Sequence, residues 1–197
     1  MASEERAPRG CGCACLGRRE VVVGAAAAIA TAAGGAPAGA EPNERRPQVG
    51  DILVHSVGPN KGRPVMVDEL VLDGPQHLAF PMDPSGLVLD GLRFNEVVVV
   101  RVDPDKLDPE ARPGSADGVV VYSAICTHEA CAVSMWNDHE KMLVCSCHGS
   151  MYDPRERARV VFGPAQRRLA QLPIRVEDGR VVVAGPFLGR LGPQRSS

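Results

Sequence analysis

The chain beyond residue 95 alternates between short β-branched runs and turn residues. The runs at residues 97–102 (VVVVRV) and 119–123 (VVVYS) are rich in valine and bounded by turn residues, a pattern typical of buried strands. Residues 174–177 and 180–184 flank Asp178-Gly179, a pair that favours a two-residue hairpin turn because both positions tolerate positive φ. The pattern therefore predicts strands joined by tight turns.

Weaker patterns occupy most of the remaining sequence. Further strands are expected at residues 51–55, 143–145 and 159–162, and a surface loop or edge hairpin at residues 81–93. Helical periodicity is confined to one turn within residues 105–112. Because Pro, Gly and Asp separate the apolar runs at short intervals, we predict an all-β fold, an antiparallel β-sandwich or small barrel.

Composition supports one folded domain and argues against binding to nucleic acid or to an anionic membrane surface. The chain has 197 residues, of which 44% are hydrophobic, with 21 Gly and 17 Pro. This content excludes a disordered chain and disfavours a helical bundle. A formal net charge of −2 gives no electrostatic reason to bind nucleic acid or an anionic membrane surface.

Residues 1–40 differ from the rest of the chain. Arg18 and Arg19 precede an uncharged run over residues 21–40, which ends in Ala38-Gly39-Ala40. A basic start, an apolar run and a small-residue end predict an export signal. The paired Arg residues resemble a twin-arginine signal, although Gly17 stands where that family usually has Ser or Thr. We therefore expect an export signal at 1–40, a folded domain at 41–197 and a periplasmic location.

A retained membrane anchor is the alternative for the same segment. A run of this length can just span a bilayer, and the protein would then remain at the periplasmic face of the membrane. Few of its residues are strongly apolar, and several Gly and one Pro weaken a lipid-spanning helix, so cleavage is favoured. Three cysteines precede the run and receive no function here: Cys11, Cys13 and Cys15.

Two short segments carry the candidate chemistry. They are residues 126–131 (CTHEAC) and 145–150 (CSCHGS), and each offers a Cys, a His and one further Cys. Zinc accepts two Cys and two His, but structural zinc sites usually use other spacings. Disulfides alone would leave the matched His residues unexplained. A [2Fe–2S] cluster with a Cys pair on one iron and a His pair on the other is the third and favoured interpretation.

This double motif closely resembles that of the Rieske iron–sulfur family. The resemblance covers residues 95–190 and implies a Rieske-type fold with a cluster-binding subdomain of two loops. It implies that Cys126 and Cys145 bind the inner iron, that His128 and His148 bind the outer iron, and that Cys131 and Cys147 form a disulfide. Gly163-Pro164 matches the family's cluster-covering loop, with Gln166 in place of its usual second Pro.

Two hydroxyl residues match positions that tune the reduction potential in this family. Ser150 and Tyr152 stand where the high-potential branch donates O–H bonds to a bridging sulfide and to a Cys sulfur. Such bonds stabilise the added electron, so they raise the potential. The simpler interpretation of Tyr152 is a half-buried aromatic residue of the core.

The sequence is similar to two exported branches of the family. One is the quinol-oxidising iron–sulfur subunit of cytochrome bc complexes, and the other is the small subunit of arsenite oxidase, which transfers electrons from a molybdenum subunit to a cytochrome. Glu129 stands where quinol-oxidising members carry an apolar residue, and a carboxylate is costly to bury there. We therefore expect a one-electron carrier for protein partners, a cytochrome or a large oxidoreductase subunit. It would not be a catalyst by itself.

Other residues carry weaker signals. His55, His77 and His139 have no Cys or His at ligand spacing, so surface or loop roles are expected for them. Trp136 is expected to pack in the core. A cluster of arginines after the second segment predicts a solvated face or a docking patch for an acidic partner: Arg155, Arg157, Arg159, Arg167 and Arg168.

Overall fold

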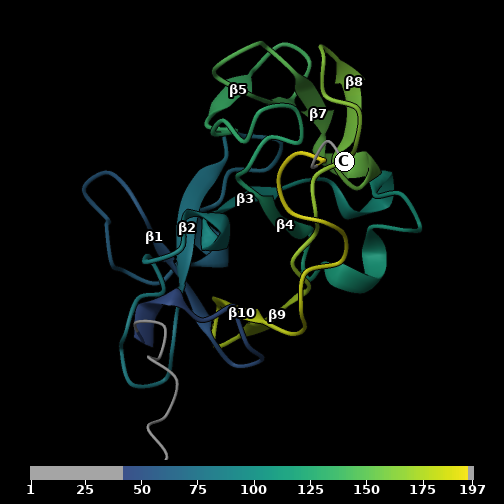
Figure 1. Ribbon diagram of the computed structural model, residues 1–197. Helices are drawn as coiled ribbons and strands as arrows, with labels where there is room; N and C mark the ends of the chain where they lie inside the picture. Colours follow the sequence, from purple (N-terminus) through teal and green to yellow (C-terminus); the bar gives the residue numbers. More distant parts are fainter. Residues whose placement is uncertain (1–41, 195–197) are drawn as a thin grey trace, which may run out of the picture. The chain divides into compact units, whose positions relative to one another are not determined.

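Antiparallel strands and short 3-10 turns make up the regular structure of the protein. The computed structural model describes residues 42–194, and this span contains no α-helix and no helix able to cross a membrane. The predicted export signal lies outside the described residues. The strands, shown in Figure 1, are β1 (Ile52–His55), β2 (His77–Met82), β3 (Val97–Arg101), β4 (Val119–Ser123), β5 (Met135–Asn137), β6 (Met142–Val144), β7 (Met151–Asp153), β8 (Arg159–Phe162), β9 (Ile174–Glu177) and β10 (Arg180–Val183).

The 3-10 turns lie between these strands and before β1. They are η1 (Pro42–Glu44), η2 (Val67–Glu69), η3 (Arg93–Asn95), η4 (Pro104–Lys106), η5 (Arg112–Gly114) and η6 (Pro154–Glu156). The single helical turn expected within residues 105–112 is thus replaced by η4 and η5, each of which contains a Pro. The prediction of an all-β antiparallel fold is confirmed.

The larger sheet has six strands in the order β4-β3-β2-β1-β10-β9. The valine runs of β3 and β4 pair in register from Val97↔Ser123 to Arg101↔Val119. Because side chains alternate along a strand, these runs supply two cores. Val98 and Val100 enter one hydrophobic cluster, whereas Val97 and Val99 enter another on the opposite face of the sheet.

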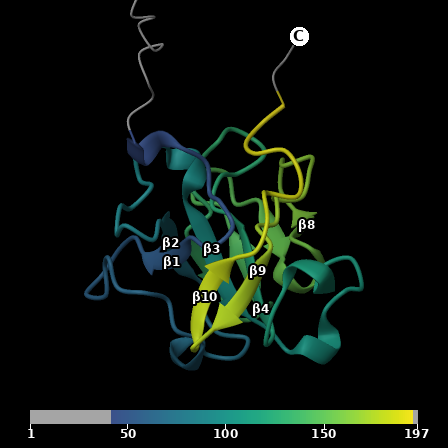
Figure 2. The same cartoon turned by 90° about the horizontal axis from the view of Figure 1, so that it is seen from below.

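The β9–β10 hairpin closes one edge of the six-stranded sheet. Asp178 and Gly179 connect its strands with φ values of 50° and 76°, as the predicted two-residue turn requires. In Figure 2 the hairpin lies in yellow beside the labelled strands of this sheet. Its outer strand β9 pairs with β10 alone, and β10 pairs in turn with β1.

The smaller sheet contains β5, β6, β7 and β8 in sequence order. Leu143 of β6 and Tyr152 of β7 are fully buried, and they belong to the same cluster as Val98, Val100 and Tyr122 of the larger sheet. The two sheets therefore share one hydrophobic core. Trp136 of β5 packs against this core as a partly buried side chain, as expected.

Strand β2 differs most from the sequence-based expectation. The segment that begins at Pro81 was expected to be a loop or edge hairpin, yet Pro81 lies within β2 opposite Leu53. Strand β3 pairs only with residues 77–79 of β2, so it does not reach Pro81. The Pro81 carbonyl accepts a hydrogen bond from the Leu89 N–H. A proline is tolerated here because no neighbouring strand needs an N–H from it.

Candidate metal centre

The two loops that carry the Cys and His residues leave different sheets. The second loop (residues 145–150) joins β6 to β7 within the smaller sheet. The first loop (residues 126–131) follows β4 of the larger sheet and precedes β5 of the smaller one. The first loop thus leads from one sheet to the other, and an isolated antiparallel bridge between Ile125 and Ala132 closes its base.

The two loops nevertheless have the same internal construction. In the first, the Cys126 N–H donates to the Cys131 carbonyl at 2.8 Å, and in the second the Cys145 N–H donates to the Ser150 carbonyl at 2.9 Å. In both, the carbonyl of the leading Cys accepts the N–H four residues later, from Ala130 at 3.1 Å and from Gly149 at 3.2 Å. These two residues both have positive φ, 55° and 66°. One backbone conformation thus presents a Cys and a His twice.

A disulfide and a hydrogen bond hold the loops together. Cys131 and Cys147 are joined by a disulfide, with their Cα atoms 6.1 Å apart, so the pairing implied by the family resemblance is confirmed. The Ser146 N–H donates to the Ala132 carbonyl at 3.1 Å. Because the loops come from different sheets, these links stabilise their relative position.

The four candidate ligands separate into an inner pair and an outer pair. The free thiols of Cys126 and Cys145 are each only 1% exposed. His128 is half-buried and His148 is exposed. Their rings meet edge to face with centroids 4.8 Å apart, and their Nδ1 atoms lie 3.3 Å apart. The arrangement places two sulfur donors inside and two nitrogen donors at the surface.

The chemistry of this donor set fits a two-iron cluster. Burial, followed by the neighbouring Cys126, raises the pKa of the Cys145 thiol, so a buried thiolate pair requires a bound cation. The donors divide into a buried sulfur pair and a nitrogen pair at the surface, and a [2Fe–2S] cluster with Cys ligands on one iron and His ligands on the other accepts this division.

The Tyr152 hydroxyl contacts one of the inner thiols. It lies 3.2 Å from Cys126 Sγ, and it accepts the N–H of Thr127 at 3.3 Å. Because its oxygen accepts this N–H, its own proton is available for the sulfur. Thr127 is in turn held by its hydroxyl, which donates to the Arg167 carbonyl at 2.5 Å. Thr127 is a positioning residue that the spacing of the Cys and His residues did not reveal.

Ser150 connects the second loop to the Gly163-Pro164 segment. The fully buried Ser150 Oγ accepts the N–H of Ala165 at 3.1 Å, which leaves its proton free to be donated. A Cβ atom at Gly163 would lie 2.6 Å from Ser150 Cα, and Gly163 has a φ of +88°. Only glycine allows the backbone to approach so closely with this φ.

A cavity of about 280 Å³ lies beside the outer imidazole of His128. It is lined by residues of the first loop, the segment after Gly163 and the C-terminal tail: Thr127, His128, Glu129, Pro164, Gln166 and Gln194. Glu129 is exposed, and its carboxylate lies 4.0 Å from His128 Nε2. The carboxylate therefore stays in water beside the candidate centre and carries no burial cost.

The arginines that follow the second loop are largely paired. Arg155 contacts Asp153, Arg159 contacts Glu156, and both Arg157 and Arg168 contact Glu110. The guanidinium of Arg167 instead donates to the carbonyls of Arg190 and Gly192. These contacts neutralise most of the expected basic patch, so they favour its interpretation as a solvated face with internal ion pairs.

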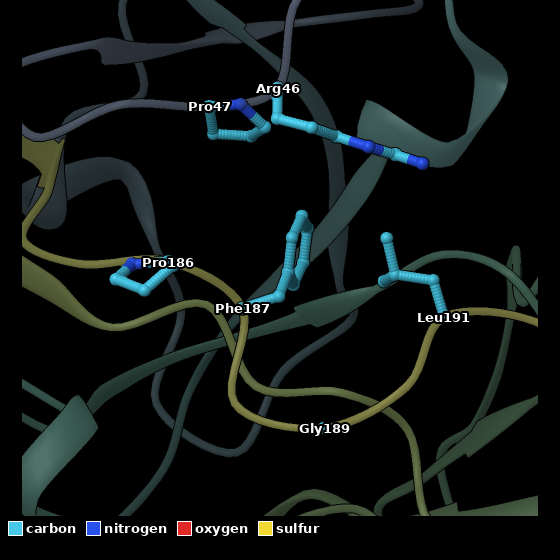
Figure 3. Close-up of a pocket in the computed structure, with 6 residues that line it drawn as sticks. All are labelled: Arg46, Pro47, Pro186, Phe187, Gly189 and Leu191. Carbon is cyan, nitrogen blue, oxygen red and sulfur yellow. The ribbon is translucent and has the colours of Figure 1, made fainter. Parts of the chain in front are cut away.

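A second cavity, of about 450 Å³, lies between the segment before β1 and the C-terminal tail (Figure 3). Arg46 and Pro47 line one side, and Pro186, Phe187, Gly189 and Leu191 line the other. None of these side chains is a thiol, an imidazole or a carboxylate. This cavity therefore offers no ligand for a metal cluster.

Comparisons with known proteins agree with this geometry. The sequence model of the Rieske [2Fe-2S] domain matches residues 89–173. The chain is 38% identical over 134 residues to a cytochrome bc1 complex Rieske iron–sulfur subunit of Streptomyces lividans, covering 57% of this chain and 79% of the relative. It is 46% identical over 141 residues to a protein of Haloferax mediterranei named as the Rieske subunit of a respiratory nitrate reductase, covering 57% and 63%.

Coverage and structural likeness vary among the matches. The chain spans 38% of the length of a longer bc1 subunit from Streptomyces coelicolor, at 34% identity over 57% of this chain. A solved structure, the plasma membrane Rieske protein PetC3 of Synechocystis PCC 6803, aligns with a TM-score of 0.37 and 23% identity, covering 56% of this chain and 87% of that one.

Proposed function

Because the chain belongs to the Rieske [2Fe–2S] family, we propose that Cys126 and Cys145 hold the inner iron of the cluster and that His128 and His148 hold the outer iron. The Rieske domain binds a [2Fe–2S] cluster, and the protein transfers electrons. When bound, the cluster takes up and releases one electron at a time. The burial of the two thiols and the exposure of the two imidazoles support this assignment.

The side chains around the ligands have distinct tasks in this proposal. The buried thiols exclude water from the inner side, while the imidazoles form the edge that a redox partner approaches. Each ligating imidazole has a second ring nitrogen that can gain or lose a proton as the charge beside it changes. Hydrogen bonds from Tyr152 and Ser150 stabilise added negative charge and so favour a high reduction potential.

We further propose that the protein acts outside the cytoplasmic membrane as a carrier between protein partners. In this role it is the small subunit of an oxidoreductase, similar to the arsenite oxidase small subunit, and passes electrons to a cytochrome. The single observation that carries this proposal is Glu129. Its exposed carboxylate lies 4.0 Å from His128 Nε2, where a hydrophobic quinol pocket would require an apolar surface. The Haloferax relative named for a nitrate reductase is consistent with such a subunit role.

Quinol oxidation in a cytochrome bc complex is the second candidate. The 38% identity to the Streptomyces lividans bc1 subunit over 79% of its length favours it. In that case the cavity beside His128 would form part of the surface that meets the cytochrome b subunit. Glu129 would then need a cationic or hydrogen-bonding partner when the surface becomes buried.

Purification of the tagged full-length chain from membranes of its source would distinguish the two roles. A complex that contains molybdenum and lacks b-type haem is expected for the oxidoreductase subunit, and metal analysis with haem difference spectroscopy would detect it. A complex with b-type haem and no molybdenum would overturn that role and support quinol oxidation. Mass spectrometry of the mature chain would test whether residues 1–40 are removed.

A further inference from the structure

Two histidines and one glutamate converge on the six-stranded sheet, outside the cluster loops. His55 ends β1, His77 begins β2, and Glu69 ends the turn η2. His55 pairs with Ala79 across the two strands. His77, two residues before Ala79, therefore lies diagonally opposite His55 on the same face, within reach of its ring. We call His55, Glu69 and His77 the triad.

The donor atoms of the triad lie close together. His55 Nε2 is 2.5 Å from Glu69 Oε1, the two imidazole centroids are 5.4 Å apart, and one ligand atom from each residue lies within 4.8 Å of the others. His55 is only 6% exposed, Glu69 is 29% exposed and His77 is half-buried. One donor is thus inside the protein, and the other two open towards solvent.

The fold holds the donor atoms of the triad in position, and it leaves the ring nitrogens of one residue without a hydrogen bond. Glu69 Oε1 accepts the Met66 N–H at 3.0 Å, which fixes its carboxylate towards His55. Neither ring nitrogen of His77 has a hydrogen-bond partner among residues 42–194. Burial and the adjacent His55 lower the pKa of His77, so its imidazole is in the neutral form that binds metals. An imidazole nitrogen without a partner next to an oriented carboxylate is a free ligand.

We propose that the triad is a binding site for a divalent transition-metal ion of the Zn²⁺ class, held by the imidazoles of His55 and His77 and the carboxylate of Glu69. Two nitrogen donors and one carboxylate oxygen are a ligand set that Zn²⁺ accepts, with water in the remaining position. The hard ions Ca²⁺ and Mg²⁺ prefer oxygen ligands alone, so they do not fit. The ion replaces the proton between His55 and Glu69 and recruits His77.

The site lies on the opposite face of the sheet from the cluster loops. Leu53 and Ala79, which share the face of His55 and His77, belong to the core on that side, whereas Leu78 packs against the core that the two sheets share. A metal in the triad would join η2 to β1 and β2. It would therefore stabilise this part of the fold and would not touch the electron-transfer site. The inference does not depend on the proposed function.

The test is a calorimetric titration of the cluster-loaded full-length protein with ZnCl₂. The variants are His77→Gln, which removes a half-buried ligand, and His139→Gln, which alters an exposed His outside the triad and serves as the matched control. Visible absorption of the cluster is followed in the same samples. Wild type and His139→Gln should each bind one Zn²⁺ with unchanged absorption and a raised Tm. His77→Gln should bind it at least ~10-fold more weakly, since even loss of an outer-shell partner costs that much.

Three results would overturn the proposal. The first is equal zinc affinity in wild type and His77→Gln. His77 would then not be a ligand, and the zinc would be bound elsewhere or by His55 and Glu69 alone. The second is equal weakening in His139→Gln. The third is zinc uptake that proceeds only with loss of cluster absorption, which would place the zinc on the cysteines. If His77→Gln does not fold, Glu69→Gln takes its place with the same expected weakening, since a neutral amide is a poorer ligand than a carboxylate.

Discussion

The cluster loops and the triad are two groups of candidate metal ligands built in opposite ways. In the loops, each Cys and His is separated by two or three positions, and one backbone conformation repeated in both loops sets their geometry. In the triad, His55, Glu69 and His77 are separated by 14 and 8 positions, and strand register together with η2 brings them together. Spacing in the sequence reveals the first kind of site and conceals the second.

The two sites also differ in the interactions that hold them together. The loops come from different sheets and depend on a disulfide and a few backbone hydrogen bonds between them. The triad depends on pairing within one sheet and on the packing of η2. Changes in the loops should therefore alter the cluster more than the fold, and changes in the triad should leave the cluster unaltered.

The largest effect is expected from His148→Ala. It removes a proposed ligand of the outer iron, so the redox-active cluster should be lost completely. EPR of the dithionite-reduced protein measures this, with His77→Gln as the comparison variant that should retain the full signal. A full signal in His148→Ala would contradict the proposed ligands, and a lost signal in His77→Gln would show that the two regions are not independent.

Cys131→Ser should have the next largest effect. The disulfide closes a segment with a sequence separation of 16, and a bridge over a loop of this size stabilises a protein by about 3 kcal/mol in the chain-entropy model. The cluster should still assemble but should decay several-fold faster, as followed by its visible absorption at constant temperature. The double variant Cys131→Ser/Cys147→Ser should behave alike, which excludes an effect of the freed thiol. An unchanged cluster lifetime in both variants would show that the disulfide does not stabilise the cluster.

A smaller change is expected from Tyr152→Phe. The hydroxyl next to Cys126 Sγ stabilises the more negative, reduced state of the cluster, so its loss should lower the reduction potential. For a one-electron couple, a tenfold change in equilibrium, or about 1.4 kcal/mol, corresponds to about 59 mV, and we expect a shift of this order by protein-film voltammetry. The matched control is Tyr122→Phe, since the buried Tyr122 hydroxyl donates to the Pro154 carbonyl and not to a Cys. Equal midpoints for Tyr152→Phe and wild type would contradict the sulfur hydrogen bond.

The smallest effects test the shared construction of the two loops. Gly149 and Ala130 occupy equivalent positions with φ of 66° and 55°, where a residue with a Cβ costs about 1–2 kcal/mol relative to glycine. Gly149→Ala should therefore lower the free energy of unfolding by about 1 kcal/mol, and Ala130→Gly should not lower it. Thermal unfolding monitored by circular dichroism would measure both. Destabilisation by Ala130→Gly would show that the loops differ in their requirements.

Much of the fold follows from local sequence pattern. Valine runs predict β3 and β4 because β-branched side chains favour extended backbone, and Asp178-Gly179 predicts the β9–β10 turn because both residues tolerate positive φ. Strand β2 was not predicted, since proline lacks a backbone N–H and Pro81 is compatible with a strand only where no neighbouring strand requires a donor at that position. Strands β5 and β7 have three residues each, too few to show an alternating pattern.

His55 and His77 were expected to have surface or loop roles, and for His55 this is wrong. Its side chain is buried at the end of β1, and no neighbouring residue in the sequence indicates its partners. Pairing of β1 with β2 supplies His77, and a turn well before β2 supplies Glu69. Such contacts depend on the register between paired strands, and the sequence of one chain does not reveal which residues lie opposite each other.

The interpretation as a [2Fe–2S] centre follows from the sequence alone, because the spacing of the Cys and His residues is a local property of a few adjacent residues. The sequence also determined the strand character of the valine runs, because their backbone preference is local. The sequence did not reveal that the first loop crosses between two sheets, that most of the arginines after the second loop contact carboxylates, or that His55, Glu69 and His77 meet. These contacts arise from strand pairing and packing between distant segments, and the energies of such contacts depend on the whole chain.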